Sequence, residues 1–187
     1  MKNCHGVLPF LSIAGLVLLL ASCGGGNDST SSPSSGGGNA LPAGDSSISL
    51  SGPAEIDNLN GRTALTKPSQ VWYMSVVGSE GRKNQVAVAF SFKPGFVPEA
   101  ETYALGSLEG MERPDVSGSV QYTPDLDGGT VSGQNFSTGI DGTITFDSVD
   151  PDVSGSFGFS ATDEEGKTAT VEGTFKTPRP EGFGEEG

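Results

Sequence analysis

The chain has 187 residues, of which 23 are acidic and 10 are basic, so its formal net charge is −13. Nucleic acid and anionic lipid headgroups are bound through clustered Lys and Arg side chains, and this balance argues against both as partners. The acidic residues instead predict a solvated surface that keeps the protein soluble.

The N-terminal segment predicts a cleaved signal peptide. The run Gly6 to Leu20 is apolar except for Ser12 and follows a single side-chain cation, Lys2. It is shorter than the roughly 20 apolar residues that a membrane-spanning helix needs, and Pro9 and Gly15 interrupt it. An apolar run of this length that ends in small residues is typical of secretion.

The residues Leu20-Ala21-Ser22-Cys23 follow this run directly. They resemble the lipobox of bacterial lipoproteins, in which an aliphatic residue and two small residues precede the cysteine that becomes the new N-terminus. The resemblance implies diacylglycerol on Cys23, cleavage before it and acylation of its amine; the alternative is ordinary secretory cleavage with an incidental thiol. Two or three acyl chains form a durable anchor. Gly24, where retained lipoproteins carry aspartate, implies by the same resemblance delivery to the outer membrane, in a leaflet left unspecified.

Cleavage before Cys23 removes His5, the only histidine, together with Cys4. The expected mature chain therefore has no Ser-His-Asp triad, Cys-His pair, histidine-ligated metal or disulfide. We expect no enzymatic activity and no cofactor.

Four regions are expected. Residues 1–22 form the signal peptide, and residues 23–45 carry the lipid on Cys23 and a Gly/Ser-rich flexible tether. Residues 46–177 form the folded domain, and residues 178–187 are predicted to be a disordered tail because they are polar and glycine-rich.

Nearly every patterned segment of the folded domain has a period of two residues, which indicates half-buried strands. In Asn84 to Phe92, for example, Val86, Val88, Phe90 and Phe92 alternate with smaller or polar residues. Short turn signals such as Asp141-Gly142 and Glu165-Gly166 separate the segments, and the connections are too short for parallel crossovers. The prediction is an all-β fold, a single antiparallel meander of eight or nine strands in a β-sandwich or a small up-and-down barrel.

Two segments leave a helix open as an alternative, Pro53 to Leu65 and Pro98 to Glu101, although neither has an apolar stripe. An internal repeat is also present, since Pro114 to Ser119 and Pro151 to Ser156 are identical. It indicates either a duplicated hairpin or convergence of two glycine- and serine-rich hairpins.

Acidic residues are candidates for calcium binding. Asp125-Leu126-Asp127-Gly128 begins like an EF-hand loop, but Gly129, Thr130 and Phe136 stand where a ligand, the turn glycine and the bidentate glutamate are required. Two further groups, one of Asp147, Asp150 and Asp152 and one of Asp163, Glu164 and Glu165, lie at predicted turns. Either group could bind calcium weakly, but solvated acids at turns are far commoner, and no metal site is expected.

Two other chemistries require no histidine. Paired carboxylates hydrolyse glycosides without histidine, but no pair is placed at a defined spacing by the sequence. Trp72 and Tyr73, adjacent on a strand, point to opposite faces, so one can join a core while the other is exposed. A role in the core or on the sheet surface is favoured for both over stacking on a sugar.

The C-terminal segments Gly142 to Phe146, Val153 to Phe157 and Val171 to Phe175 share Gly, Thr and Phe spacing. They resemble the closing strands of small β-rich envelope lipoproteins of unknown function, which implies an antiparallel β fold and no transferable activity.

The resulting hypothesis is a lipid-anchored outer-membrane lipoprotein whose non-catalytic β-domain binds an envelope protein or a surface polysaccharide. The alternatives are a small-ligand carrier with a cavity inside a barrel and, more remotely, a carboxylate-based glycosidase.

Overall fold

The computed structural model describes residues 46–107, 113–126 and 133–184. These residues form ten strands and no helix. The strands are β1 (Ser46–Ser51), β2 (Ile56–Thr66), β3 (Tyr73–Glu80), β4 (Lys83–Phe92), β5 (Thr102–Gly106), β6 (Val116–Asp125), β7 (Gln134–Phe136), β8 (Thr138–Ser148), β9 (Asp152–Thr162) and β10 (Thr168–Pro178). The all-β prediction is confirmed, with ten strands in place of eight or nine.

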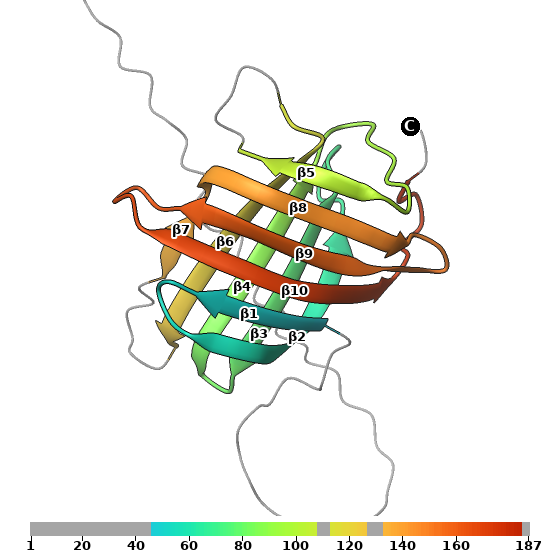
Figure 1. The fold of residues 1–187 in the computed structure, drawn as a ribbon. Coiled ribbons are helices and arrows are strands. Elements are labelled where there is room, and N and C mark those ends of the chain that lie inside the picture. Colours follow the sequence, from blue (N-terminus) through green and yellow to red (C-terminus); the bar gives the residue numbers. More distant parts are fainter. Residues whose placement is uncertain (1–45, 108–112, 127–132, 185–187) are drawn as a thin grey trace, which may run out of the picture. The chain divides into compact units, whose positions relative to one another are not determined.

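The strands form one sheet that closes on itself. Its order is β4-β3-β2-β1-β10-β9-β8-β5-β6, with β6 pairing back to β4, and β7 is added to β6. The closed sheet has two layers: β5, β8, β9, β10 and β1 cross over β6, β4, β3 and part of β2 (Figure 1). The pairing of β6 with β4 closes the sheet into a barrel-like fold with two layers, to which β7 adds one short strand.

The pairing departs from a simple meander at β5 and β6, which are parallel neighbours. The prediction that the connections are too short to join parallel strands is wrong for β5 and β6. Only the end of β5 and the start of β6 are in register, at Leu105 opposite Val116 and Gly106 opposite Ser117. Because the two strands overlap only at these ends, the chain between them does not have to travel back along a full strand.

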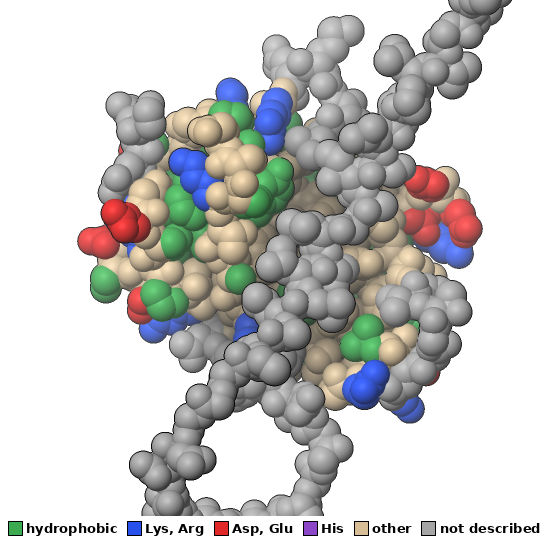
Figure 2. Space-filling model, turned by 180° about the vertical axis from the view of Figure 1, so that it is seen from behind, with side chains coloured by type: hydrophobic (Ala, Val, Ile, Leu, Met, Phe, Trp, Pro, Cys, Tyr) green, Lys and Arg blue, Asp and Glu red, His purple; other side chains and the backbone are tan. Residues whose placement is uncertain are grey.

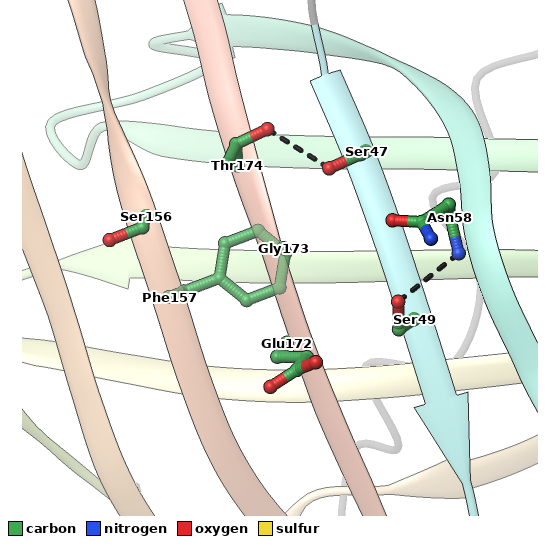
Figure 3. Close-up of a pocket in the computed structure, with 8 residues that line it drawn as sticks. All are labelled: Ser47, Ser49, Asn58, Ser156, Phe157, Glu172, Gly173 and Thr174. Carbon is green, nitrogen blue, oxygen red and sulfur yellow. Dashed lines mark hydrogen bonds between the residues drawn. The ribbon is translucent and has the colours of Figure 1, made fainter.

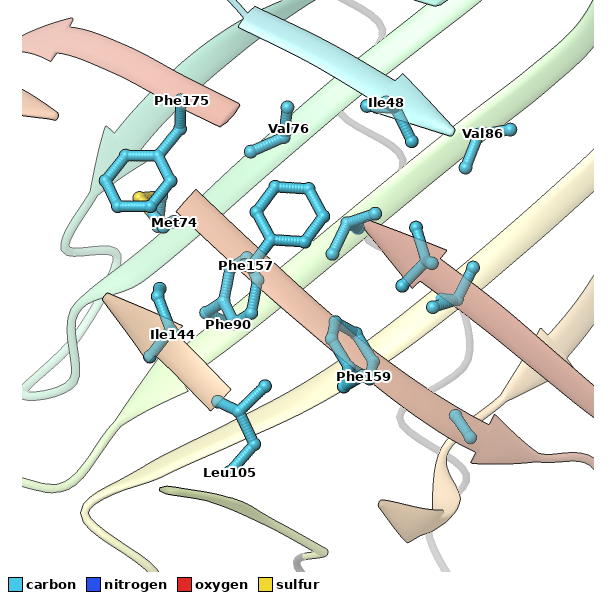
Figure 4. Close-up of a cluster of buried hydrophobic side chains, with 14 of the residues drawn as sticks. Ile48, Met74, Val76, Val86, Phe90, Leu105, Ile144, Phe157, Phe159 and Phe175 are labelled. Carbon is cyan, nitrogen blue, oxygen red and sulfur yellow. The ribbon is translucent and has the colours of Figure 1, made fainter. Parts of the chain in front are cut away.

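The residues that alternate in the sequence point into the barrel. On β4, Val86, Val88, Phe90 and Phe92 are all buried. The Phe90 ring meets the rings of Phe157 and Phe159 from β9, with centroids 5.3 and 5.9 Å apart and edge-to-face geometry (Figure 4). Aromatic contacts of this kind join the two layers of the barrel and add to the burial of the rings.

A strand replaces the helix considered for Pro53 to Leu65. In β2 the inward residues are Ile56, Leu59 and Gly61, so the two-residue period is broken. The break is a β-bulge, since Ile48 of β1 lies opposite Leu59 but Leu50 lies opposite Ile56. A bulge places an extra residue in one strand and hides the alternation from pattern analysis.

The two copies of the repeat have the same structural role. Pro114 to Ser119 and Pro151 to Ser156 each lead into a long central strand, β6 and β9. In each copy the valine is buried and the glycine lies opposite a phenylalanine of the neighbouring strand, Phe90 for Gly118 and Phe175 for Gly155. The aspartate of each copy forms an ion pair with a lysine, Asp115 with Lys93 directly after β4 at 3.4 Å and Asp152 with Lys176 of β10 at 3.3 Å.

The segment after β10 departs from the disordered tail expected over residues 178–187. Phe183 is 1 % exposed, and its ring contacts Trp72 and Phe92 at centroid distances of 5.3 and 5.8 Å. Arg179 Nε also donates a 2.9 Å hydrogen bond to the carbonyl oxygen of Phe183. One aromatic residue therefore anchors a segment whose composition is otherwise polar, and residues 185–187 lie outside the described part.

Replacing Phe183 with alanine is expected to lower the free energy of unfolding by about 2 kcal/mol, the typical value of burying a phenylalanine side chain. It should also shift the emission of Trp72, the only tryptophan, because Trp72 loses its ring contact. Urea denaturation of the full chain, followed by tryptophan fluorescence, measures both effects. Glu181→Ala, at an exposed position of the same segment, is the matched control and should change neither. Unchanged stability and emission in Phe183→Ala would contradict the docking of this segment.

Candidate binding face

Most outward positions of one layer of the barrel carry small hydroxyl side chains, and Asp141, Asp147, Asp152, Glu172 and Lys176 are among the others. In β1, β5, β8, β9 and β10 the inward residues are mainly apolar, and the alternate residues face solvent. This surface, seen from the front in Figure 1, is called the hydroxyl face. It consists of Ser47, Ser49, Ser51, Thr102, Thr143, Thr145, Ser154, Ser156, Ser160, Thr168, Thr170 and Thr174.

Strand register aligns part of the hydroxyl face into a row across six strands. From β5 to β2, consecutive register partners are Thr102, Thr145, Ser156, Thr174, Ser47 and Asn60. Two pairs of hydroxyls in this row are hydrogen-bonded to each other, Thr102 with Thr145 at 2.9 Å and Ser47 with Thr174 at 3.0 Å. With strands about 4.8 Å apart, the row extends over roughly 24 Å.

A depression of about 300 Å³ lies on the hydroxyl face at the middle of this row (Figure 3). Its polar side chains come from four strands that the closed sheet brings together, Ser47, Ser49, Asn58, Ser156, Glu172 and Thr174. Asn58 is at the bulge of β2 and has a positive φ of 51°. Its backbone N–H donates a 3.2 Å hydrogen bond to Ser49 Oγ, which fixes the bulge against β1.

Among the described residues, Glu172 is the only carboxylate that lines the depression. Its register neighbours are Ser49 and Gly158, so a small side chain lies on one side and none on the other. In the described part of the chain no basic residue forms an ion pair with Glu172. Lys176, further along β10, pairs instead with Asp152.

The acidic turns considered for calcium have other partners. Asp163 Oδ1 accepts hydrogen bonds from the backbone N–H groups of Glu165 and Lys167, at 2.9 and 2.8 Å. The Lys167 ammonium lies 2.7 Å from the Glu165 carboxylate, and this hydrogen bond raises the pKa of Lys167. These contacts close the turn between β9 and β10.

The other acidic group is also engaged in ion pairs, Asp152 with Lys176 and Asp150 with Arg179 at 3.7 Å. The EF-hand-like segment is described only up to its second residue, because 127–132 lie outside the described residues. Within the described ranges no group of three or more His, Cys, Asp or Glu side chains is arranged to hold a metal ion.

Trp72 and Tyr73 lie on opposite faces, as their adjacency predicts. Trp72 packs against Phe183, and the Lys67 ammonium lies 5.4 Å from the centroid of its ring. Tyr73 is 39 % exposed and is the one exposed large hydrophobic side chain among the described residues. Figure 2, the view from the other side, shows scattered groups of hydrophobic side chains with Lys, Arg, Asp and Glu around them.

Tyr103 shows a perturbed acidity on the inner side of β5. Its ring packs between Phe96 and Phe146, and burial raises the pKa of its phenol. The backbone N–H of Glu99 donates a 2.8 Å hydrogen bond to the Tyr103 hydroxyl, which acts in the opposite direction but is the smaller effect. These contacts give Tyr103 a packing role.

Cys23 and the segments predicted to be the signal peptide and the tether lie outside the described residues. In the part that is described, no helix is long and apolar enough to cross a membrane. Comparison with protein-family models, with curated proteins and with solved structures finds no match to the chain. The fold and the hydroxyl face thus define the class only as a closed, mainly antiparallel β-domain with one polar, hydroxyl-rich side.

Proposed function

We propose that this protein is a lipid-anchored outer-membrane lipoprotein whose non-catalytic β-domain binds a surface polymer through the hydroxyl face. The anchor rests on the residues Leu20-Ala21-Ser22-Cys23 after an apolar run. The observation that supports polymer binding is the row of hydroxyl and amide side chains across six strands. Hydroxyls both donate and accept hydrogen bonds, so such a row suits a chain with a repeated polar pattern.

A polymer is favoured over a protein partner by the composition of the face. Protein interfaces are enriched in aromatic residues, Met and Arg at their centres and depleted in serine. The outward positions of β9 and β10 hold mainly Ser, Thr and Gly, and their phenylalanines all face the interior.

The two alternatives receive less support. A carrier needs an enclosed apolar cavity, whereas the interior beside Phe90 is occupied by the rings of Phe157 and Phe159. A glycosidase needs two carboxyl groups across a cleft, whereas the described residues that line the depression on the hydroxyl face include one, Glu172.

The anchor is tested by metabolic labelling of the full chain with a fatty-acid probe. The wild type should be labelled and should fractionate with the outer membrane, and Cys23→Ser should lose the label. An unlabelled wild type would remove the anchor from the proposal.

Polymer binding is tested by co-sedimentation with insoluble polysaccharides that carry neutral, amine-bearing or anionic groups. Thr145→Val with Thr174→Val removes two hydroxyls of the row at nearly constant shape, and it should weaken binding about tenfold at roughly 0.5–1.5 kcal/mol per hydrogen bond. The control is Ser75→Ala with Ser119→Ala. These two residues lie on β3 and β6, which belong to the other layer. Failure of the wild type to bind any of the three classes would contradict the proposed function.

A further inference from the structure

The starting observation is a carboxylate without a basic partner among the described residues, in a depression whose other described lining side chains are uncharged. Glu172 is exposed and lines the depression with Ser47, Ser49, Asn58, Ser156 and Thr174. Gly158, its register neighbour on β9, has open space above it: a Cβ added there would meet only Glu172 Cβ, at 4.0 Å. The carboxylate is therefore accessible from the side of β9 as well as from above.

The side chains around Glu172 are suited to receive a cation. A primary ammonium has three donors and no acceptor, so it needs a carboxylate and further oxygen acceptors around it. Figure 3 shows the oxygens of Ser49, Ser47 and Asn58 on one side of Glu172 and that of Ser156 on the other. An anionic ligand would be repelled by the charge of Glu172. A neutral ligand would remove water from this charge without giving it a partner, which costs free energy.

The dimensions favour a sugar unit within a longer chain. A volume of about 300 Å³ is at the lower end of the range for small-molecule sites. Ser156, Thr174 and Ser47 line the depression and also belong to the hydroxyl row, so polar contacts continue on both sides of it. The spacing of the row, about 4.8 Å between strands, is close to the length that one pyranose unit adds to an extended β-linked chain.

We propose that the hydroxyl face binds a polysaccharide that carries free primary amines, with one ammonium held by Glu172 and the sugar hydroxyls on the row from Thr102 to Asn60. This inference rests on the proposed function and specifies its ligand class. A lysine-rich protein segment offers the same ammonium group, but it has no hydroxyls to match the row.

The test uses isothermal titration of the full chain, in detergent, with four soluble probes: hexamers of β-1,4-linked glucosamine, N-acetylglucosamine and glucose, and hexalysine. The glucosamine hexamer should bind about tenfold more tightly than the other two sugars, because its ammonium forms a charge-assisted hydrogen bond with Glu172 that the other two sugars cannot form. Glu172→Gln should abolish this preference. Glu164→Gln, which removes one charge at an exposed position of the turn between β9 and β10, should retain it.

Four outcomes overturn the inference. They are equal binding of the three sugars, binding of hexalysine as tight as that of the glucosamine hexamer, loss of the preference in Glu164→Gln, and its retention in Glu172→Gln. In each of these cases the proposed function still stands if the chain binds sugar and Thr145→Val with Thr174→Val weakens that binding. An unchanged tryptophan emission spectrum and thermal midpoint establish that Glu172→Gln is folded.

Discussion

Replacing Phe90 with alanine is expected to lower the free energy of unfolding by about 3–5 kcal/mol, the usual cost of removing a buried phenylalanine ring. Phe90 is fully buried, and its ring touches Phe157 and Phe159 of the opposite layer. The strands of both layers are hydrogen-bonded to their neighbours, so the layers cannot easily collapse into the space that alanine leaves. Since the free energy of unfolding of small domains is about 5–15 kcal/mol, this single change removes a large share of it.

The measurement is equilibrium urea unfolding of the full chain, followed by the fluorescence of Trp72. Ala89→Ser, at the adjacent exposed position of β4, is the control and should stay within about 0.5 kcal/mol of the wild type. A loss below about 1 kcal/mol in Phe90→Ala would mean that the two layers are not joined through this ring.

Alternation was sufficient to predict the strands that bury large residues. In β4 valine and phenylalanine recur at every second position, and in β9 and β10 phenylalanine, valine, alanine and glycine share the inward positions, so the period of two continues along each strand. A side chain on a strand has only two faces to choose from, so an uninterrupted period of two fixes both the strand and its inward face. This is why the all-β prediction could be made without knowledge of the topology.

The features that sequence analysis missed depend on single residues or on distant pairing. The bulge at Asn58 shifts the inward positions of β2 and removes the period that would have identified it. Phe183 is the one buried aromatic residue of a polar segment. The average composition of the segment does not reveal the contribution of this single residue. The contact of β5 with β8 on one side and β6 on the other brings together segments that no local pattern connects.

The hydroxyl face was partly visible in the sequence. Thr143 and Thr145, Ser154 and Ser156, and Thr168 and Thr170 are each separated by one inward residue, so each pair marks an outward hydroxyl pattern. Their alignment into a row was not visible, because β1 pairs with β10 across more than a hundred residues of sequence. The depression and the isolation of Glu172 follow from this register and could not be predicted without it.

The second large effect is expected for Gly173→Ala, which should lower the free energy of unfolding by about 2–3 kcal/mol through overpacking. Gly173 points inward on β10 and lies directly opposite Phe157, whose ring covers it. A Cβ at this position would collide with the carbonyl oxygen of Ser47 and lie 2.7 Å from Phe157 Cζ. The backbone oxygen cannot yield without breaking the pairing of β1 with β10, and the ring is held by Phe90.

Gly158→Ala separates this steric effect from the general consequences of losing a glycine. Gly158 is on the neighbouring strand β9, points outward and has open space where a Cβ would lie. Its replacement should be neutral or should stabilise the protein by up to about 1 kcal/mol, because alanine restricts the unfolded chain. Equal urea midpoints for the two variants would contradict the close packing of Phe157 over Gly173. A selective loss in Gly173→Ala would show that the missing side chain at this position is what allows the aromatic ring to lie against β10 beneath the hydroxyl face.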